Sequence, residues 1–336
     1  MRRMLILFGW NALLGAQAVL AQVSGYTPPT GFKTFSLELT SGVVAVSPSG
    51  KMAVATGRFG GGATITVYDR IAPQGRQVLT TVSHAQWQFF GGLAWRDDNT
   101  LVFAENGDLD TLLEWDTTTS TVNTLAPVGS LPNVADVAIV GNQVLALGAD
   151  GPNANKLYRV ANGTVTVLVD AYGTGYAGGL GFHNGLIYAG DTNDPAFTGN
   201  PGQVFRFQPT FDADGLITGV SLVDVLSLAG GGGSGVVSFA FDSEGDLIAT
   251  TQRTLTLLQG TQSTPFGQFS GGYPFPTSIA YYGNGFEPFQ GTGILIVNAE
   301  YTEVGGLFAI TPVPEPASLL MLGAGMAGLV FSRRRR

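Results

Sequence analysis

The stretch "VVAVSPSGKMAVATG", residues 43–57, decides the fold because its pattern recurs along the chain. It joins a short apolar strand, a polar turn and a second apolar strand. Its further copies are "GLAWRDDNTLVFAENG" (92–107), "VADVAIVGNQVLALGADG" (134–151), "GLGFHNGLIYAGDTN" (179–193), "VVSFAFDSEGDLIATTQ" (236–252) and an interrupted one at 277–300 with "FEPFQGT" inserted in its turn. The turn residues Gly50, Asn99, Asn142, Gly185 and Gly245 are spaced by 49, 43, 43 and 60 residues.

Third and fourth strands follow most of these pairs, as in "TITVYDR" and "KLYRVANG" with "TVTVLVDA". Repeats of about 40 to 50 residues with up to four strands each are typical of a β-propeller. We therefore predict an all-β propeller of six blades. Residues 32–39, "FKTFSLEL", have no partner of their own, and we expect them to close the last blade as its outer strand. A β-sandwich or a β-helix is the alternative fold.

The repeats resemble those of the NHL-repeat and gluconolactonase-like propellers, although no copy matches their motifs strictly. The resemblance implies that a site would lie at one mouth of the propeller axis. It also implies a bound metal ion that polarises a lactone or ester carbonyl.

Composition sets limits on function. Gly accounts for 49 of 336 residues and charged residues for only 12%, which is far from a typical cytosolic enzyme. The chain has no Cys, which excludes disulfides, Cys nucleophiles and Cys-based zinc sites. The only histidines, His84 and His183, fit no metal spacing and no G-x-S-x-G elbow accompanies them.

The N-terminus has the pattern of a secretory signal peptide. Arg2 and Arg3 precede an apolar stretch to about Leu20, and small residues surround Ala21, where we place the cleavage. A buried first helix is the alternative. We therefore assign residues 1–21 to a signal peptide and residues 22–311 to the propeller body.

The C-terminus, residues 312–336, carries a second targeting pattern. An apolar segment of about fifteen residues, 317–331, predicts a single short membrane helix. Four arginines follow, Arg333, Arg334, Arg335 and Arg336, which would stop translocation and stay on the cytoplasmic side. In front of the segment lies the motif Val313, Pro314, Glu315 and Pro316.

Together these features resemble the PEP-CTERM sorting signal of Gram-negative bacteria. The resemblance implies that the secretion machinery exports the chain and that an exosortase recognises the motif and removes the tail. The body would then reach the cell surface or an exopolysaccharide matrix. A permanent one-helix anchor is the alternative.

Without the two sorting segments, the body has 10 Lys and Arg against 23 Asp and Glu, a net charge near −13. Such a surface repels phosphate backbones, so we expect no nucleic-acid partner. Cations, polysaccharides or surface proteins are better candidates.

Loops that follow the second strand of each copy should open on one face of the propeller. Carboxylates and amides gather there, and oxygen ligands of this kind suit Ca²⁺. By the resemblance, the residues expected to hold calcium are Glu105, Asn155, Asp191 and Asn298. The alternative is that these side chains cap the backbone of their own loops.

Two other patterns have a structural and a functional reading. "FDADGLITG" at 211–219 looks like part of a calcium loop but has Leu216 and Val223 where an EF-hand needs oxygen ligands, so a turn is favoured. Trp87, Trp95 and Trp115, with Phe89 and Phe90, would stack on sugars if exposed, but packing between blades is favoured.

The sequence favours a non-catalytic binding or structural protein at the cell surface or in the matrix. The alternative is a calcium-dependent lactonase-like or ester hydrolase that acts at the propeller axis.

Overall fold

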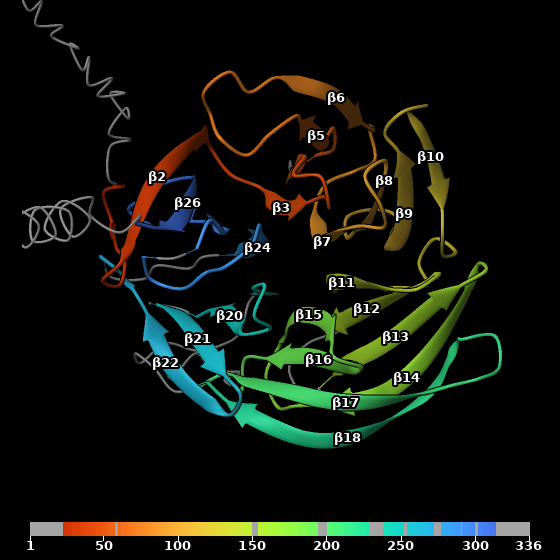
Figure 1. Ribbon diagram of the computed structural model, residues 1–336. Helices are drawn as coiled ribbons and strands as arrows, with labels where there is room; N and C mark the ends of the chain where they lie inside the picture. The colour runs from red at the N-terminus through yellow and green to blue at the C-terminus, as the bar shows by residue number, and fades with distance from the viewer. Residues whose placement is uncertain are drawn as a thin grey trace, which may run out of the picture.

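The computed structural model describes residues 23–57, 60–149, 154–193, 200–228, 238–251, 254–271, 277–289, 291–299 and 302–313. In these residues every regular element is a strand. The strands form a propeller of six four-stranded antiparallel sheets, which we call blades 1 to 6 in chain order (Figure 1). The prediction of a six-bladed propeller is confirmed.

From the axis outward, blade 1 consists of β3 (Val43–Val46), β4 (Met52–Thr56), β5 (Thr64–Tyr68) and β6 (Val78–Ser83). Blade 2 consists of β7 (Phe90–Trp95), β8 (Thr100–Glu105), β9 (Thr111–Asp116) and β10 (Thr121–Thr124). Blade 3 consists of β11 (Val134–Val140), β12 (Gln143–Ala149), β13 (Asn155–Ala161) and β14 (Thr164–Tyr172).

In the same order, blade 4 consists of β15 (Ala177–His183), β16 (Leu186–Asp191), β17 (Gln203–Phe211) and β18 (Ile217–Ser227). Blade 5 consists of β19 (Phe239–Phe241), β20 (Leu247–Thr250), β21 (Leu255–Gln259) and β22 (Gln262–Phe266). Blade 6 consists of β24 (Ser278–Tyr282), β25 (Ile294–Asn298), β26 (Leu307–Pro312) and β2 (Phe32–Leu39). A small extra sheet pairs β1 (Tyr26–Thr27) with β23 (Gln268–Phe269).

The ring closes through the N-terminal strand, as predicted. Strand β2 pairs antiparallel with β26, which places the first long strand of the body beside the last one (red beside blue in Figure 1). Leu37 of β2 is fully buried in a cluster with Val44 and Met52 of blade 1 and Ile296 of blade 6. The closing strand thus contributes to the interface between the last blade and the first.

The hydrophobic core is divided among the contacts between neighbouring blades. Each of six buried clusters draws its side chains from two adjacent blades, and together they complete the circle. This explains why second strands such as Met52–Thr56 are apolar almost throughout, because a neighbouring blade covers each face. The outer strand β6, in contrast, has no buried residue.

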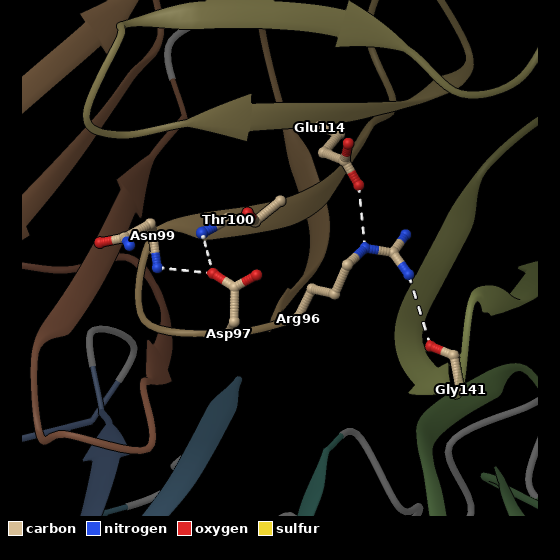
Figure 2. A network of polar contacts seen from close by, with 6 residues as sticks. All are labelled: Arg96, Asp97, Asn99, Thr100, Glu114 and Gly141. Atoms are coloured by element: carbon tan, nitrogen blue, oxygen red, sulfur yellow. Dashed lines mark hydrogen bonds and ion pairs between the residues drawn. The ribbon is translucent and has the colours of Figure 1, made fainter.

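Polar contacts also connect blades at the turns between first and second strands. Arg96, which follows β7, donates from Nε to Glu114 Oε2 at 3.0 Å and from Nη1 to the carbonyl oxygen of Gly141 at 3.5 Å (Figure 2). Asp97 Oδ1 accepts the N–H of Thr100 at 2.9 Å and so holds the turn itself. The turn of blade 2 is therefore fixed to the turn of blade 3.

The expected C-terminal membrane helix, residues 317–331, lies outside the described residues. The part of the chain that the structure describes contains no helix with the length and apolar character of a membrane span. The signal-peptide prediction, residues 1–21, also lies outside them.

Candidate functional site at the propeller axis

A small cavity of about 100 Å³ lies on the propeller axis. The beginnings of the inner strands of all six blades line it, and the lining includes Val43, Gly91, Asp136, Leu180, Phe239 and Ser278. Within that lining Asp136 is the one charged residue. Among the described residues, this cavity therefore offers a single carboxyl group, that of Asp136.

The chain holds Asp136 from two blades. Its Oδ1 accepts the N–H of Val137 at 2.8 Å, and its Oδ2 accepts the N–H of Leu180 in blade 4 at 2.8 Å. Burial raises the pKa of Asp136 from 3.8 to about 7, although both hydrogen bonds act in the opposite direction. A carboxyl group with such a pKa can exchange a proton near neutral pH.

Two glycines of blade 2 make room for strand β11 and for this carboxylate. A Cβ atom on Gly92 would collide with Asp136 Oδ1, and one on Gly91 would collide with the carbonyl oxygen of Val134. Strand β7 can therefore lie close to β11 only because both positions lack a side chain.

Glu105, one of the four predicted calcium ligands, bonds to the backbone of its own loop and of the segment before β7. It is fully buried at the end of β8. Its Oε1 accepts the N–H groups of Gln88 at 2.9 Å and Gly107 at 2.8 Å, and its Oε2 accepts the N–H of Leu109 at 3.0 Å. These contacts fit the loop-capping alternative, since three backbone donors already occupy the carboxylate.

Asn155 and Asp191, two more predicted ligands, meet between blades 3 and 4. Asn155 Nδ2 donates to Asp191 Oδ2 at 2.6 Å, and Asp191 also accepts the N–H groups of Gly175 at 3.0 Å and Asn193 at 2.7 Å. Burial raises the pKa of Asp191. The Oδ1 of Asn155 is buried without a hydrogen-bond partner, so this pair retains one unsatisfied acceptor.

Asn298, the fourth predicted ligand, bonds within blade 6. Its Nδ2 donates to Thr277 Oγ1 at 2.9 Å, and its carbonyl oxygen accepts the N–H of Thr277 at 3.0 Å. Of the four residues, the structure thus brings only Asn155 and Asp191 into contact. Calcium binding by the four residues as a set stays a prediction. Over the described part of the chain, no three acidic or histidine side chains form a group that could hold a metal.

Several loop residues of the predicted face lie outside the described residues, namely Asp150, Asn153, Asp194, Gln252 and Glu300. The same holds for Pro314, Glu315, Pro316 and Arg333 to Arg336 of the sorting signal. Val313, the first residue of the motif, is described, and its N–H donates to the carbonyl oxygen of Gly31 at 2.7 Å.

The preferred readings of the two other sequence patterns are confirmed in their main points. Asp212 Oδ1 accepts the N–H groups of Asp214 at 3.0 Å and Leu216 at 2.8 Å, so "FDADGLITG" forms a turn. Trp87 and Trp115 are buried in the cluster between blades 1 and 2. Trp95 is only partly buried and lines a hollow at the opposite mouth of the axis.

Asp136 is the site residue that the sequence analysis missed. The available signal was a charged residue inside the apolar stretch "VADVAIV". Burial of a carboxylate on a strand that lines the axis costs free energy, so such a residue indicates a specific structural or functional role.

The comparisons with known proteins identify the sorting signal. Residues 312–336 match the PEP-CTERM protein-sorting motif. The motif indicates an exported protein that an exosortase processes and that is sorted to the cell envelope. The match begins at Pro312, which is also the last residue of β26.

The propeller body resembles solved structures in fold. One is a gluconolactonase from Xanthomonas campestris, 13% identical, with a TM-score of 0.60, covering 87% of this chain and 97% of that one. Another is a luciferin-regenerating enzyme, 14% identical, with a TM-score of 0.56, covering 85% of this chain and 96% of that one. At these identities the likeness concerns the fold alone. Among curated proteins, none matches this sequence.

Proposed function

We propose that this chain is a binding or structural protein of the cell surface or the exopolysaccharide matrix, delivered there after an exosortase removes its tail. The observation that carries the proposal is the position of the sorting motif. It starts at the last residue of β26, the strand that β2 pairs with to complete the ring. A cut at the motif would therefore leave all six blades intact.

The other elements of the proposal have their own support. The basic and apolar pattern of residues 1–21 supports export through the inner membrane. The net charge near −13 favours neutral glycans, cations or basic protein surfaces as partners. The bonds of Glu105 to backbone N–H groups support a structural role for this loop carboxylate.

The test is fractionation of a tagged full-length chain in a Gram-negative host that has an exosortase. An epitope inserted at Gly260, an exposed turn between β21 and β22, would report on the body. We expect the unchanged chain in the outer fraction, and the chain with Ala at positions 314, 315 and 316 as a precursor in the inner membrane. A host without exosortase should retain the unchanged chain in the same way. Equal release of both chains would refute the proposal.

A calcium-dependent lactonase-like or ester hydrolase is the second candidate function. The observation that favours it is the Asp136 carboxyl group in the axial cavity, whose pKa of about 7 suits proton transfer at neutral pH. Calcium titration by calorimetry, together with assays on lactones and esters, tests this candidate. Hydrolysis that Asp136→Asn abolishes would support it, and the absence of both calcium binding and hydrolysis would reject it.

A further inference from the structure

A second hollow lies at the other mouth of the axis, on the face of the turns between first and second strands. Its volume is about 570 Å³, which is within the range of small-molecule sites. It is lined by the last residues of the inner strands in blades 1, 2 and 6 and by residues of the turns that follow the inner strands in blades 1, 5 and 6. Neither the sorting signal nor the predicted calcium residues belong to it.

Three aromatic side chains line this hollow, and each also contacts other residues of the protein. Trp95 Nε1 donates to the carbonyl oxygen of Ala45 at 3.3 Å. Tyr281 packs edge-on against Phe286, with ring centroids 5.5 Å apart. The third, Tyr282, lies directly over Gly50, where a Cβ atom would be 2.8 Å from the ring. The rings therefore require little reordering to receive a ligand.

Polar groups line the hollow beside the rings. Asp242 Oδ1 accepts the N–H groups of Glu244 at 3.0 Å and Asp246 at 2.8 Å, so both turn donors bond to one oxygen. Its Oδ2 has no hydrogen-bond partner among the described residues and remains available as an acceptor. Ser243 Oγ lies 3.2 Å from the hydroxyl oxygen of Tyr281.

Aromatic rings next to a carboxylate acceptor match the chemistry of a pyranose. The C–H face of the sugar packs on an aromatic ring, and its hydroxyl groups donate to the carboxylate. Uronic acids, phosphates and sulfates would be repelled by Asp242 together with its neighbours Glu244 and Asp246. The hollow therefore suits an uncharged sugar.

We propose that this hollow binds a neutral pyranose unit of a polysaccharide, with Trp95, Tyr281 and Tyr282 as the stacking surface and Asp242 as the hydroxyl acceptor. This inference rests on the proposed binding role and assigns it a ligand class and a site. It places that site at the mouth opposite the loops predicted to hold calcium.

The chain offers a matched control for the acceptor. The turn "FDSEGDL" around Asp242 and the turn "FDADGLI" around Asp212 have the same hydrogen bonds, with Asp212 Oδ1 also accepting two backbone N–H groups at 3.0 and 2.8 Å. Asp212 is exposed between β17 and β18 and does not line the hollow. Asn in place of either residue preserves the turn and removes the charge.

The experiment is titration of the full-length chain, in a detergent without a sugar headgroup, with cellohexaose, laminarihexaose and maltohexaose. Tryptophan fluorescence and calorimetry report binding, and polygalacturonate is the anionic comparison. We expect at least one neutral glucan to bind and polygalacturonate not to bind. Asp242→Asn should weaken the binding about tenfold, as expected for one lost charge-assisted hydrogen bond. Asp212→Asn should leave it unchanged.

Three results would overturn the inference. The first is that none of the neutral glucans binds at millimolar concentration. The second is that polygalacturonate binds more tightly than the neutral glucans. The third is that Asp242→Asn and Asp212→Asn weaken glucan binding equally. Thermal melting of both variants shows whether either has a folding defect. If Asp242→Asn does, Asn284→Ala replaces it, because this variant removes an exposed side chain of the hollow. Delivery to the cell surface does not depend on these results, so a failure here leaves the fractionation test of the proposed function intact.

Discussion

Asp136 in blade 3 accepts the backbone N–H of Leu180 in blade 4 at 2.8 Å, at the centre of the propeller. Burial raises the pKa of this carboxyl group from 3.8 to about 7. Because the folded-state pKa lies above the unfolded-state value, the unfolded chain loses this proton at lower pH than the native protein does. The contribution of Asp136 to stability is thus complete below about pH 4 and is lost as the pH rises to about 7.

We therefore predict that the melting temperature falls between about pH 5 and about pH 8 and that Asp136→Asn reduces this fall. Ionisation of this carboxyl group lowers the free energy of unfolding by at most about 4 kcal/mol. Asp242, whose pKa burial raises to about 6, contributes in the same direction, so some of the pH dependence should persist in the variant. Thermal melts of both proteins across this range provide the measurement. An unchanged pH dependence in the variant would contradict the prediction.

The turn glycines of the repeat should differ in their sensitivity to substitution. Gly50 has φ +89°, and a Cβ atom there would lie 2.8 Å from the ring of Tyr282, whereas Gly185, with φ +78°, faces open space. Gly185→Ala should cost about 1 kcal/mol for the left-handed backbone alone. Gly50→Ala should cost about 1–3 kcal/mol more because of overpacking. Urea unfolding measures both, and equal costs would show that the contact with Tyr282 does not matter.

The closing strand should be a sensitive part of the ring. Leu37 of β2 is fully buried, so Leu37→Ala should destabilise the protein by about 2–5 kcal/mol. Leu222 of β18 is 54% exposed and provides a matched control, since Leu222→Ala should change stability by less than about 0.5 kcal/mol. Denaturant unfolding compares the two. If both variants are equally stable, β2 does not contribute to the core as described.

Glu105 should be a structural residue whether calcium is present or not. Glu105→Gln would place an amide donor against at least one backbone N–H of the loop and should cost about 1–3 kcal/mol. The same loss of melting temperature is expected in EDTA and in calcium. A loss that appears only in calcium would instead identify Glu105 as a metal ligand, as the resemblance to gluconolactonase-like propellers implies.

The architecture could be predicted because it depends on repetition. Six copies of a strand pair, with turn residues such as Gly50 and Gly245 at similar spacings, predict both the blades and their number. The closing role of residues 32–39 followed from their lack of a partner. These features are local in sequence, and the same apolar pattern that marks each strand also buries it between two blades.

The site could not be predicted in the same way because its contacts join different blades. The bond of Asn155 to Asp191 spans 36 residues, and that of Asp136 to Leu180 spans 44. Whether a loop carboxylate is already bonded to backbone N–H groups, as Glu105 is, depends on the path of its loop. For Asp242, the hollow beside it depends on how side chains from four blades lie at one mouth, which the repeat pattern does not specify.

The measurement that tests the central claim most directly is the intact mass of the protein recovered from the outside of a Gram-negative host that has an exosortase. We predict a mass that corresponds to a chain beginning at Gln22 and ending near residues 313–316, so that the whole propeller is present without either sorting segment. A mass that includes residues 317–336, with Arg333 to Arg336 still attached, would contradict removal of the tail and indicate a permanent anchor.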